Sequence, residues 1–117
     1  MRKFIEGFKV AFSGILFCFR GERNFRIQFA SALLVVIAGI CFGIAQWQWV
    51  AILLCCAIVL ALEMINTSIE KLADAVDGKF NERIKVVKDI AAGAVLVASI
   101  FCFVIALFIL LPKIFSS

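Results

Sequence analysis

The longest uncharged stretch of the chain is its strongest structural constraint. No charged residue lies between Arg26 and Glu63. A single helix across that stretch would be roughly 50 Å long, whereas the hydrocarbon core of a bilayer is only ~30 Å thick. The stretch must therefore fold back on itself, and the sequence predicts two membrane spans, at 27–43 and 49–65.

The turn between these spans is predicted at 43–48 (GIAQWQ), where two Gln interrupt the apolar run and two Trp in or beside the turn suit the headgroup region. A further uncharged run predicts a third span at 90–112, which Pro112 is expected to end. The composition is 65% hydrophobic and 17% charged, with a mean hydropathy of +1.14. These values exclude a soluble domain and indicate an all-α membrane protein.

The distribution of positive charge predicts how the chain is oriented. Of twelve Lys and Arg, most lie before the first span (Arg2, Lys3, Lys9, Arg20, Arg23, Arg26) or between the second and third (Lys71, Lys79, Arg83, Lys85, Lys88). By the positive-inside rule the N-terminus and the segment 70–89 are cytoplasmic, and the C-terminus lies outside. The net charge of +4 is explained by topology, and no basic groove indicates nucleic-acid binding.

The first twenty residues have the pattern of a helix lying in the membrane interface. Apolar residues recur at intervals of three and four: Phe4, Phe8, Phe12, Ile15 and Phe19. A cleaved signal peptide is excluded because Glu6 and Lys9 interrupt its would-be apolar core. We therefore expect an N-terminal amphipathic surface helix before the three transmembrane helices.

A row of polar residues continues directly out of the second predicted span. This acidic stripe lies within about a third of the helix circumference and consists of Glu63, Asn66, Thr67, Glu70, Asp74 and Asp77. Four carboxylates beside lipid repel one another and resist desolvation unless cations or a phosphate-bound metal neutralise them. The stripe therefore indicates a functional site at the cytoplasmic edge of the membrane.

Simpler explanations exist for each part of this pattern. Glu63 can be a snorkelling residue paired with a Lys, and Glu70 and Asp74 can be a solvated helix face. Lys88 and Asp89 can mark the start of the third span, with the Asp capping free amides. A small transporter would also use an intramembrane Glu, but near the bilayer centre, whereas a non-catalytic adaptor would not need the stripe.

Other residue types limit the chemistry. The five Cys lie in apolar surroundings without a CxxC pair, which indicates inert thiols. The chain has no His, so a general base must be a carboxylate. No glycine-rich phosphate loop is present, so a nucleotide must be held by side chains and metal. No repeat or linker divides the chain, which we treat as one domain, residues 1–117.

Three motifs resemble the prokaryotic diacylglycerol kinase family, which includes the undecaprenol kinases. They are GERNFRIQ at 21–28, ALEMINTSIEKLADAV at 61–76 and IKVVKDIAAGAVLVA at 84–98, in family order and spacing. The resemblance covers essentially the whole chain, and NFRI and KDIAAGAVL look nearer to the undecaprenol-kinase branch. It implies a homotrimeric lipid kinase in the bacterial inner membrane. The kinase would transfer the ATP γ-phosphate to diacylglycerol or undecaprenol, giving phosphatidic acid or undecaprenyl phosphate.

The resemblance also implies roles for individual residues. Glu63 matches the catalytic base, and Asn66 matches a neighbouring polar residue of the active site. Glu22 and Glu70 match the acids that hold Mg²⁺ on ATP. Nucleotide contacts are implied for Lys3, Glu22, Glu70, Asp74, Lys88 and Asp89. Where many members of the family have an aromatic residue followed by His, this chain has Phe80-Asn81, so the loop contacts to the nucleotide are in doubt.

The physical requirements of phosphoryl transfer agree with these roles. The reaction needs charge neutralisation and an aligned nucleophile, which carboxylate-bound metal and Lys88 would supply. Two helical turns, about 10 Å, separate Glu63 from Glu70, which suits a lipid hydroxyl at the membrane edge and Mg-ATP just outside it. One surface helix and three spans offer little room to enclose both substrates, so we expect an oligomer with its sites between subunits. Glu22 can reach a site either within its own chain or across an interface.

Overall fold

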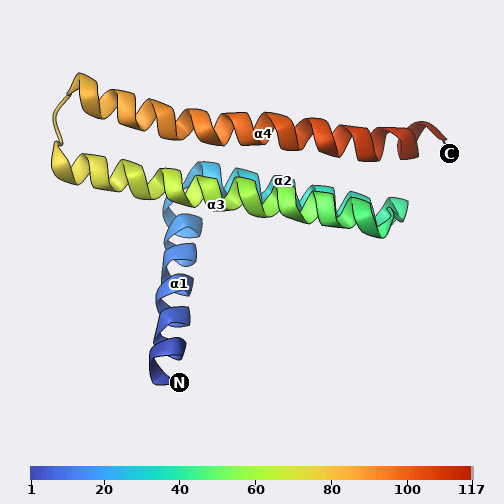
Figure 1. Ribbon diagram of the computed structural model, residues 1–117, viewed down its shortest axis with the longest axis horizontal. Helices are drawn as coiled ribbons and strands as arrows, with labels where there is room; N and C mark the ends of the chain where they lie inside the picture. The colour runs from blue at the N-terminus through green and yellow to red at the C-terminus, as the bar shows by residue number, and fades with distance from the viewer. Residues whose placement is uncertain (117) are drawn as a thin grey trace.

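The computed structural model describes residues 1–116 and forms four α-helices within that range. They are α1 (Arg2–Gly21), α2 (Arg23–Phe42), α3 (Gln46–Val76) and α4 (Glu82–Ser116). The helices α2, α3 and α4 lie side by side, whereas α1 projects transversely from their flank (Figure 1). Among the helices of residues 1–116, these three are long and apolar enough to cross a membrane. The chain is therefore an all-helical membrane protein, as its composition predicts.

The turn between α2 and α3 falls inside the predicted segment but is shorter. Gly43 adopts the left-handed conformation (φ 63°, ψ 53°), which glycine tolerates without steric cost. The N–H of Ile44 donates to the carbonyl of Gly39 (3.2 Å), and the N–H of Ala45 donates to the side-chain oxygen of Gln48 (2.9 Å). These bonds satisfy backbone groups at both helix ends, so the reversal needs only three residues between α2 and α3.

The lengths of the helices differ in a way that places the site. Helix α2 has 20 residues and α3 has 31. At 1.5 Å per residue these are about 30 Å and 46 Å, so α2 just spans the hydrocarbon core and α3 exceeds it. Both α3 and α4 extend past the α1–α2 junction, at the end opposite the α2–α3 turn (Figure 1). The three predicted spans are confirmed as apolar helices; the second and third are parts of longer helices, and the first runs one residue past the end of α2.

The prediction that Pro112 ends the last helix is wrong. Pro112 lies inside α4, which continues to Ser116. Proline lacks the N–H that would bond the carbonyl one turn earlier, and its ring disfavours a helical conformation in the preceding residue. Here it stands in the final turns of a 35-residue helix, whose remaining backbone hydrogen bonds continue past the one that proline cannot form.

Side-chain hydrogen bonds organise the loop between α3 and α4. Asp77 accepts from the backbone N–H of Lys79 (3.0 Å) and from the side-chain amide of Asn81 (3.2 Å). The side-chain oxygen of Asn81 in turn accepts from the N–H of Arg83 (2.9 Å) at the start of α4. Asn81 therefore caps α4, and the alternative in which Asp89 caps the third span is wrong. Asp77 follows the last residue of α3 and is not on its face.

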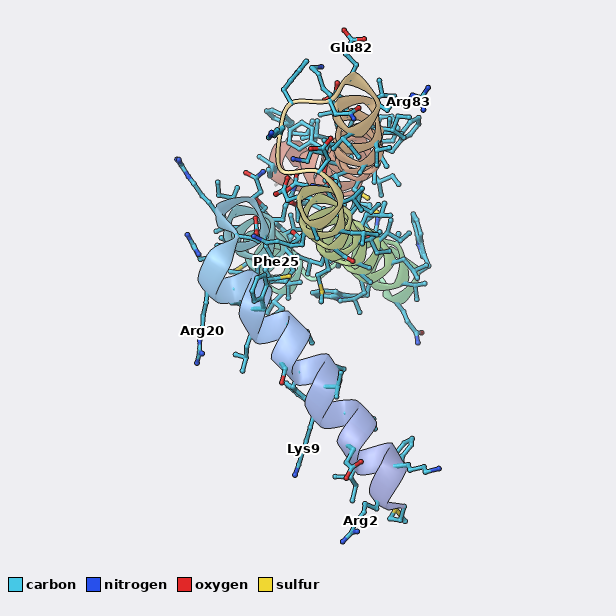
Figure 2. All side chains as sticks on the ribbon, turned by 90° about the vertical axis from the view of Figure 1, so that its left-hand side faces the viewer. Arg2, Lys9, Arg20, Phe25, Glu82 and Arg83 are labelled. Carbon is cyan, nitrogen blue, oxygen red and sulfur yellow. The ribbon has the colours of Figure 1, made fainter. Side chains whose placement is uncertain are left out.

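Aromatic and backbone contacts fix α1 against α2. The ring of Phe19 packs edge-on against the rings of Phe25 and Phe29, with distances between ring centroids of 4.9 Å and 4.8 Å. The guanidinium of Arg26 donates to the carbonyls of Phe19 (2.8 Å) and Arg20 (3.3 Å), the last turn of α1. Figure 2 shows Phe25 at this junction and α1 leading away from it. The predicted N-terminal helix therefore exists, and its place in the membrane interface stays a prediction.

Candidate active site

The buried polar residues of the described chain all belong to the acidic stripe. They are Glu63, Asn66 and Thr67, with 4%, 7% and 4% of their surface exposed. All three lie on α3, at positions that helical periodicity places on one face. Burying a carboxylate is costly unless it is paired or has a function. The structure therefore singles out the region around Glu63 as the candidate site.

Glu22 comes to this region from the junction of α1 and α2. It is the single residue between the two helices and the N-cap of α2, yet its side chain makes no capping hydrogen bond. Its carboxylate instead lies 3.8 Å from the ammonium of Lys71 on α3. This ion pair places Glu22 beside α3 at Lys71, one residue along the chain from Glu70, which the resemblance assigns to Mg²⁺. Glu22 is thus held beside α3 of its own chain, and its contribution to a site stays a prediction.

The acids are close enough to influence one another electrostatically. The charges of Glu70 and Glu22 both act on Glu63. Burial raises the pKa of the Cys18 thiol above its ordinary value, and the nearby charges of Glu22 and Glu63 raise it further. Cys18, which is 4% exposed and lies in the last turns of α1, is therefore in the same cluster. Three carboxylates so arranged repel one another unless a cation joins them.

Asn66 lies between the predicted base and the predicted metal ligand. Its side-chain amide donates to a carboxylate oxygen of Glu70 (3.4 Å). Its side-chain oxygen is buried and has no hydrogen-bond partner. An unsatisfied buried acceptor is costly, which indicates that a donor from a ligand or a bound water completes this site.

The donor set fits Mg²⁺ delivered together with phosphate. Within residues 1–116, no three Asp, Glu or Cys side chains lie close enough to hold a metal by themselves. Mg²⁺ prefers oxygen ligands and commonly uses one or two carboxylates together with water and substrate phosphates. Glu22 and Glu70 supply two carboxylates, and the free oxygen of Asn66 lies beside them. A metal that arrives with a nucleotide therefore needs no third protein carboxylate.

A second polar group joins α3 to α4 outside the buried region. The ammonium of Lys88 lies 2.5 Å from a carboxylate oxygen of Asp74. Asp89 pairs instead with Lys85 of its own helix (2.6 Å). The structure thus brings Lys88 to Asp74 of the acidic stripe, whereas Asp89 pairs within its own helix, and the nucleotide contacts of all three stay predictions.

Lys3 is not near these groups in the single chain. It is exposed and belongs to the first turn of α1, and that end of the helix lies far from α3 (Figure 1). The helix that separates it from Glu22 is about 28 Å long at 1.5 Å per residue. A contact between Lys3 and the nucleotide therefore requires another copy of the chain.

Two residues of the cluster were not singled out in the sequence. Lys71 faces Glu22 and also lies over the ring of Phe17, 5.6 Å from its centre. Cys18 is buried and lies near enough to Glu22 and Glu63 for their charges to act on its thiol. Helical spacing from Glu63 could not have found either, because both depend on how α1 packs against α3.

Comparison with known proteins gives consistent results. The family model described as prokaryotic diacylglycerol kinase matches residues 9–110. An undecaprenol kinase of Bacillus subtilis is 36% identical over 113 residues, which cover 97% of this chain and 92% of that protein. A diacylglycerol kinase of Synechocystis is 33% identical over 113 residues, covering 96% of this chain and 65% of that protein. A diacylglycerol kinase of Helicobacter pylori is 30% identical over 103 residues, covering 82% of this chain and 80% of that protein.

Proposed function

The chain belongs to the prokaryotic diacylglycerol kinase family and is an ATP-dependent lipid kinase, and we propose that Glu63 is its general base. The observation that carries this proposal is the burial of Glu63 among Glu22, Glu70 and Asn66, at the membrane end of the acidic stripe. A protein with only a structural role would have no reason to bury a carboxylate beside two others. Membership of the family also decides against the transporter and adaptor alternatives.

The proposed reaction is a single phosphoryl transfer. The oxygen of a lipid hydroxyl forms a bond to the γ-phosphorus of ATP, and the bond from that phosphorus to the β–γ bridging oxygen breaks. The hydroxyl proton passes to the carboxylate of Glu63, and ADP leaves with the electron pair of the broken bond. The products are a lipid phosphate and ADP. The lipid is diacylglycerol or undecaprenol, the two substrates named by the relatives.

We assign Glu22 and Glu70 to Mg²⁺, which when bound would neutralise charge on the phosphates. Lys88, held beside Asp74, would place a further positive charge near the transferred group, and Asp74 and Asp89 would contact the nucleotide. Asn66 is assigned to orient Glu70, to which its amide donates, and to accept a hydrogen bond from a substrate or water with its free oxygen.

The lengths of the helices support the proposed orientation. If α2 spans the bilayer, the part of α3 beyond Glu63 lies outside the hydrocarbon core, together with the start of α4. The excess of Lys and Arg at this end makes it the cytoplasmic side, where ATP is available. We therefore place the protein in the bacterial inner membrane as a single domain, with α1 in the interface and the C-terminus outside.

We propose a homotrimer in which neighbouring chains complete each site. The distance of Lys3 from its own acidic stripe supports this, because only a neighbouring chain can bring a Lys3 to the nucleotide. Glu22, Glu63 and Glu70 would all come from one chain, since they lie together in the structure.

The direct test is Mg²⁺-dependent transfer of labelled phosphate from γ-labelled ATP to lipid extracted from bacterial membranes. Purified protein should label a lipid, and the labelled product should migrate with phosphatidic acid or undecaprenyl phosphate. Removing Mg²⁺ with a chelator should abolish labelling. Absence of any labelled lipid with folded protein would refute the proposal.

A further inference from the structure

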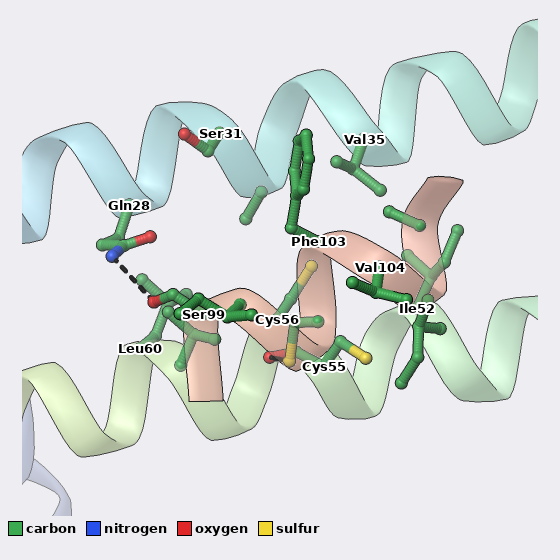
Figure 3. A pocket seen from close by; sticks show the side chains of 16 residues that line it. Gln28, Ser31, Val35, Ile52, Cys55, Cys56, Leu60, Ser99, Phe103 and Val104 are labelled. Atoms are coloured by element: carbon green, nitrogen blue, oxygen red, sulfur yellow. Dashed lines mark hydrogen bonds between the residues drawn. The ribbon is translucent and has the colours of Figure 1, made fainter. Parts of the chain in front are cut away.

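The ion pair between Glu22 and Lys71 is too long to be a hydrogen bond. The ammonium of Lys71 lies 3.8 Å from a carboxylate oxygen of Glu22, whereas a charge-assisted hydrogen bond is about 2.7–2.9 Å long. The contact that joins α2 to α4 is different, since the side-chain amide of Gln28 donates to the hydroxyl of Ser99 (3.2 Å) at one end of an apolar cavity (Figure 3). Glu22 and Lys71 are therefore held together by charge alone.

The two partners differ in how much each needs the other. Only 21% of the Glu22 side chain is exposed, and no hydrogen bond to it forms within residues 1–116. The Lys71 side chain is 58% exposed, and its ammonium also lies 5.6 Å from the centre of the Phe17 ring. A carboxylate withdrawn from water needs a counter-charge, whereas an exposed ammonium is solvated by water and attracted to the face of the ring. Lys71 can therefore leave Glu22 readily, provided that another cation takes its place.

Lys71 also supplies positive charge to a cluster of acids. The charges of Glu22 and Glu70 both act on Glu63. No other Lys or Arg of residues 1–116 forms an ion pair with any of these three acids. A divalent metal held by Glu22 would place two positive charges beside the ammonium, and like charges repel strongly in a partly buried site. The ammonium and the metal are therefore competitors for Glu22.

We propose that Lys71 is the counter-ion of Glu22 in the metal-free protein and that the divalent metal displaces it; this inference rests on the proposed function, in which Glu22 binds Mg²⁺. In the metal-free protein, Lys71 reduces the repulsion among the acids. When the metal binds, the ammonium moves toward solvent and the ring of Phe17. Lys71 therefore lowers the affinity for metal through Glu22, without touching a substrate, and so raises the Mg²⁺ concentration that the kinase needs.

The test measures the Kd of purified protein in detergent for Mg²⁺ with AMP-PNP, a non-hydrolysable ATP analogue, by calorimetry. The titration is repeated with AMP-PNP alone in EDTA. Loss of an exposed ion pair changes an equilibrium by a factor of about two to five, so Lys71→Gln should lower the Kd for Mg·AMP-PNP by about two- to fivefold. The Kd for AMP-PNP alone should not fall, because no metal then competes with the ammonium.

Two further variants control for charge. Lys79→Gln removes the same charge from an exposed residue of the α3–α4 loop that forms no ion pair within residues 1–116, and its Kd for Mg·AMP-PNP should stay within about twofold of wild type. Lys71→Arg keeps the charge and should bind no tighter than wild type. An equal fall in Kd for Lys79→Gln, or for Lys71→Gln without metal, would mean a general effect of charge and would overturn the proposal.

Thermal unfolding gives a readout that does not depend on titrating the site. In EDTA without nucleotide, Lys71→Gln should unfold at a lower temperature than wild type, because Glu22 has lost its counter-ion. Saturating Mg·AMP-PNP should close this gap, because the metal then takes the place of the ammonium. A pair with only a structural role would leave the same gap in both conditions, which would contradict the proposal.

Glu22→Ala in the same calorimetric assay separates this inference from the proposed function. It should weaken the binding of Mg·AMP-PNP, and Lys71→Gln added to it should no longer tighten binding. If Glu22→Ala weakens binding but Lys71→Gln leaves the Kd unchanged or raises it, the displacement is refuted and the assignment of Glu22 to Mg²⁺ stands. If Glu22→Ala leaves the Kd unchanged, that assignment fails, and this inference fails with it.

Discussion

Replacement of Glu63 by Gln should separate catalysis from stability. The amide has nearly the same size as the carboxylic acid, so the packing around this 4% exposed side chain is kept. What is lost is the proton acceptor. General-base catalysis contributes about 10²- to 10⁴-fold, so we expect kcat to fall by 100-fold or more.

The same substitution should not destabilise the protein. In the absence of ATP and metal, the carboxylate of Glu63 is buried near those of Glu70 and Glu22, and neighbouring carboxylates repel one another. A neutral amide at position 63 removes that repulsion. We therefore expect the thermal unfolding midpoint in detergent to stay the same or to rise, and the affinity for Mg-ATP to change little.

The two measurements together are decisive. Turnover is followed by labelled phosphate transfer under saturating lipid and ATP, unfolding by circular dichroism and nucleotide affinity by calorimetry. Glu6→Gln, an equivalent change at an exposed position of α1, is the matched control and should leave all three unchanged. Turnover of the Glu63→Gln variant within a few-fold of wild type would rule out Glu63 as the base, and a large fall in the unfolding midpoint would contradict the electrostatic reasoning.

Three further predictions follow from the same geometry. Glu22→Ala and Glu70→Ala should each raise the Mg²⁺ concentration needed for half-maximal activity, and the double variant should be much less than additive; additive effects would place the two acids at separate sites. Mixed oligomers of inactive Glu22→Ala and Glu63→Gln chains should not regain activity, because both residues would serve the site of one chain. Mixed oligomers of Lys3→Ala and Glu63→Gln chains should regain part of the activity, because Lys3 would serve the site of a neighbouring chain. A pull-down verifies that the mixed oligomers form. The raised pKa of Cys18 means that less of this thiol is ionised at pH 7.5, so maleimide should label it several-fold more slowly than an exposed Cys. The labelling rate of Cys18 should keep rising above pH 9. Labelling of Cys18 as fast as an exposed Cys would contradict its burial.

The membrane spans could be predicted because hydropathy and charge act over many residues at once. The ends of the helices could not be predicted in this way, because hydrophobicity does not decide where the backbone hydrogen bonds of a helix stop. Helix α3 continues through Glu63 and Glu70 to Val76, and α4 begins at Glu82 because Asn81 caps it. A sequence shows which residues can cap a helix, here Asn81 and Asp89, but it does not show which of them does.

The acidic stripe could be predicted because all of its helical members lie on α3, and the period of a helix fixes which residues share a face. Contacts between helices could not be derived in the same way. The ion pair of Glu22 with Lys71 depends on the direction in which α1 leaves α2. That direction is set by the packing of Phe19 and by the hydrogen bonds that Arg26 donates to the end of α1. No periodic pattern in the sequence reveals these contacts.

In the proposed function, α3 sets the distance between the residue that meets the lipid in the membrane and the residues that meet ATP in water. In the proposed orientation, the α1–α2 junction, which holds Glu22, would lie at the level where α2 leaves the bilayer, with Glu63 buried near it. From Glu63 the same helix rises about 10 Å to Glu70 and about 16 Å to Asp74, at 1.5 Å per residue. A lipid cannot rise far from the membrane and ATP cannot enter it, so the reacting groups meet only if rigid elements span this distance. A continuous helix satisfies that requirement, which accounts for the extension of α3 well beyond the length that the bilayer demands.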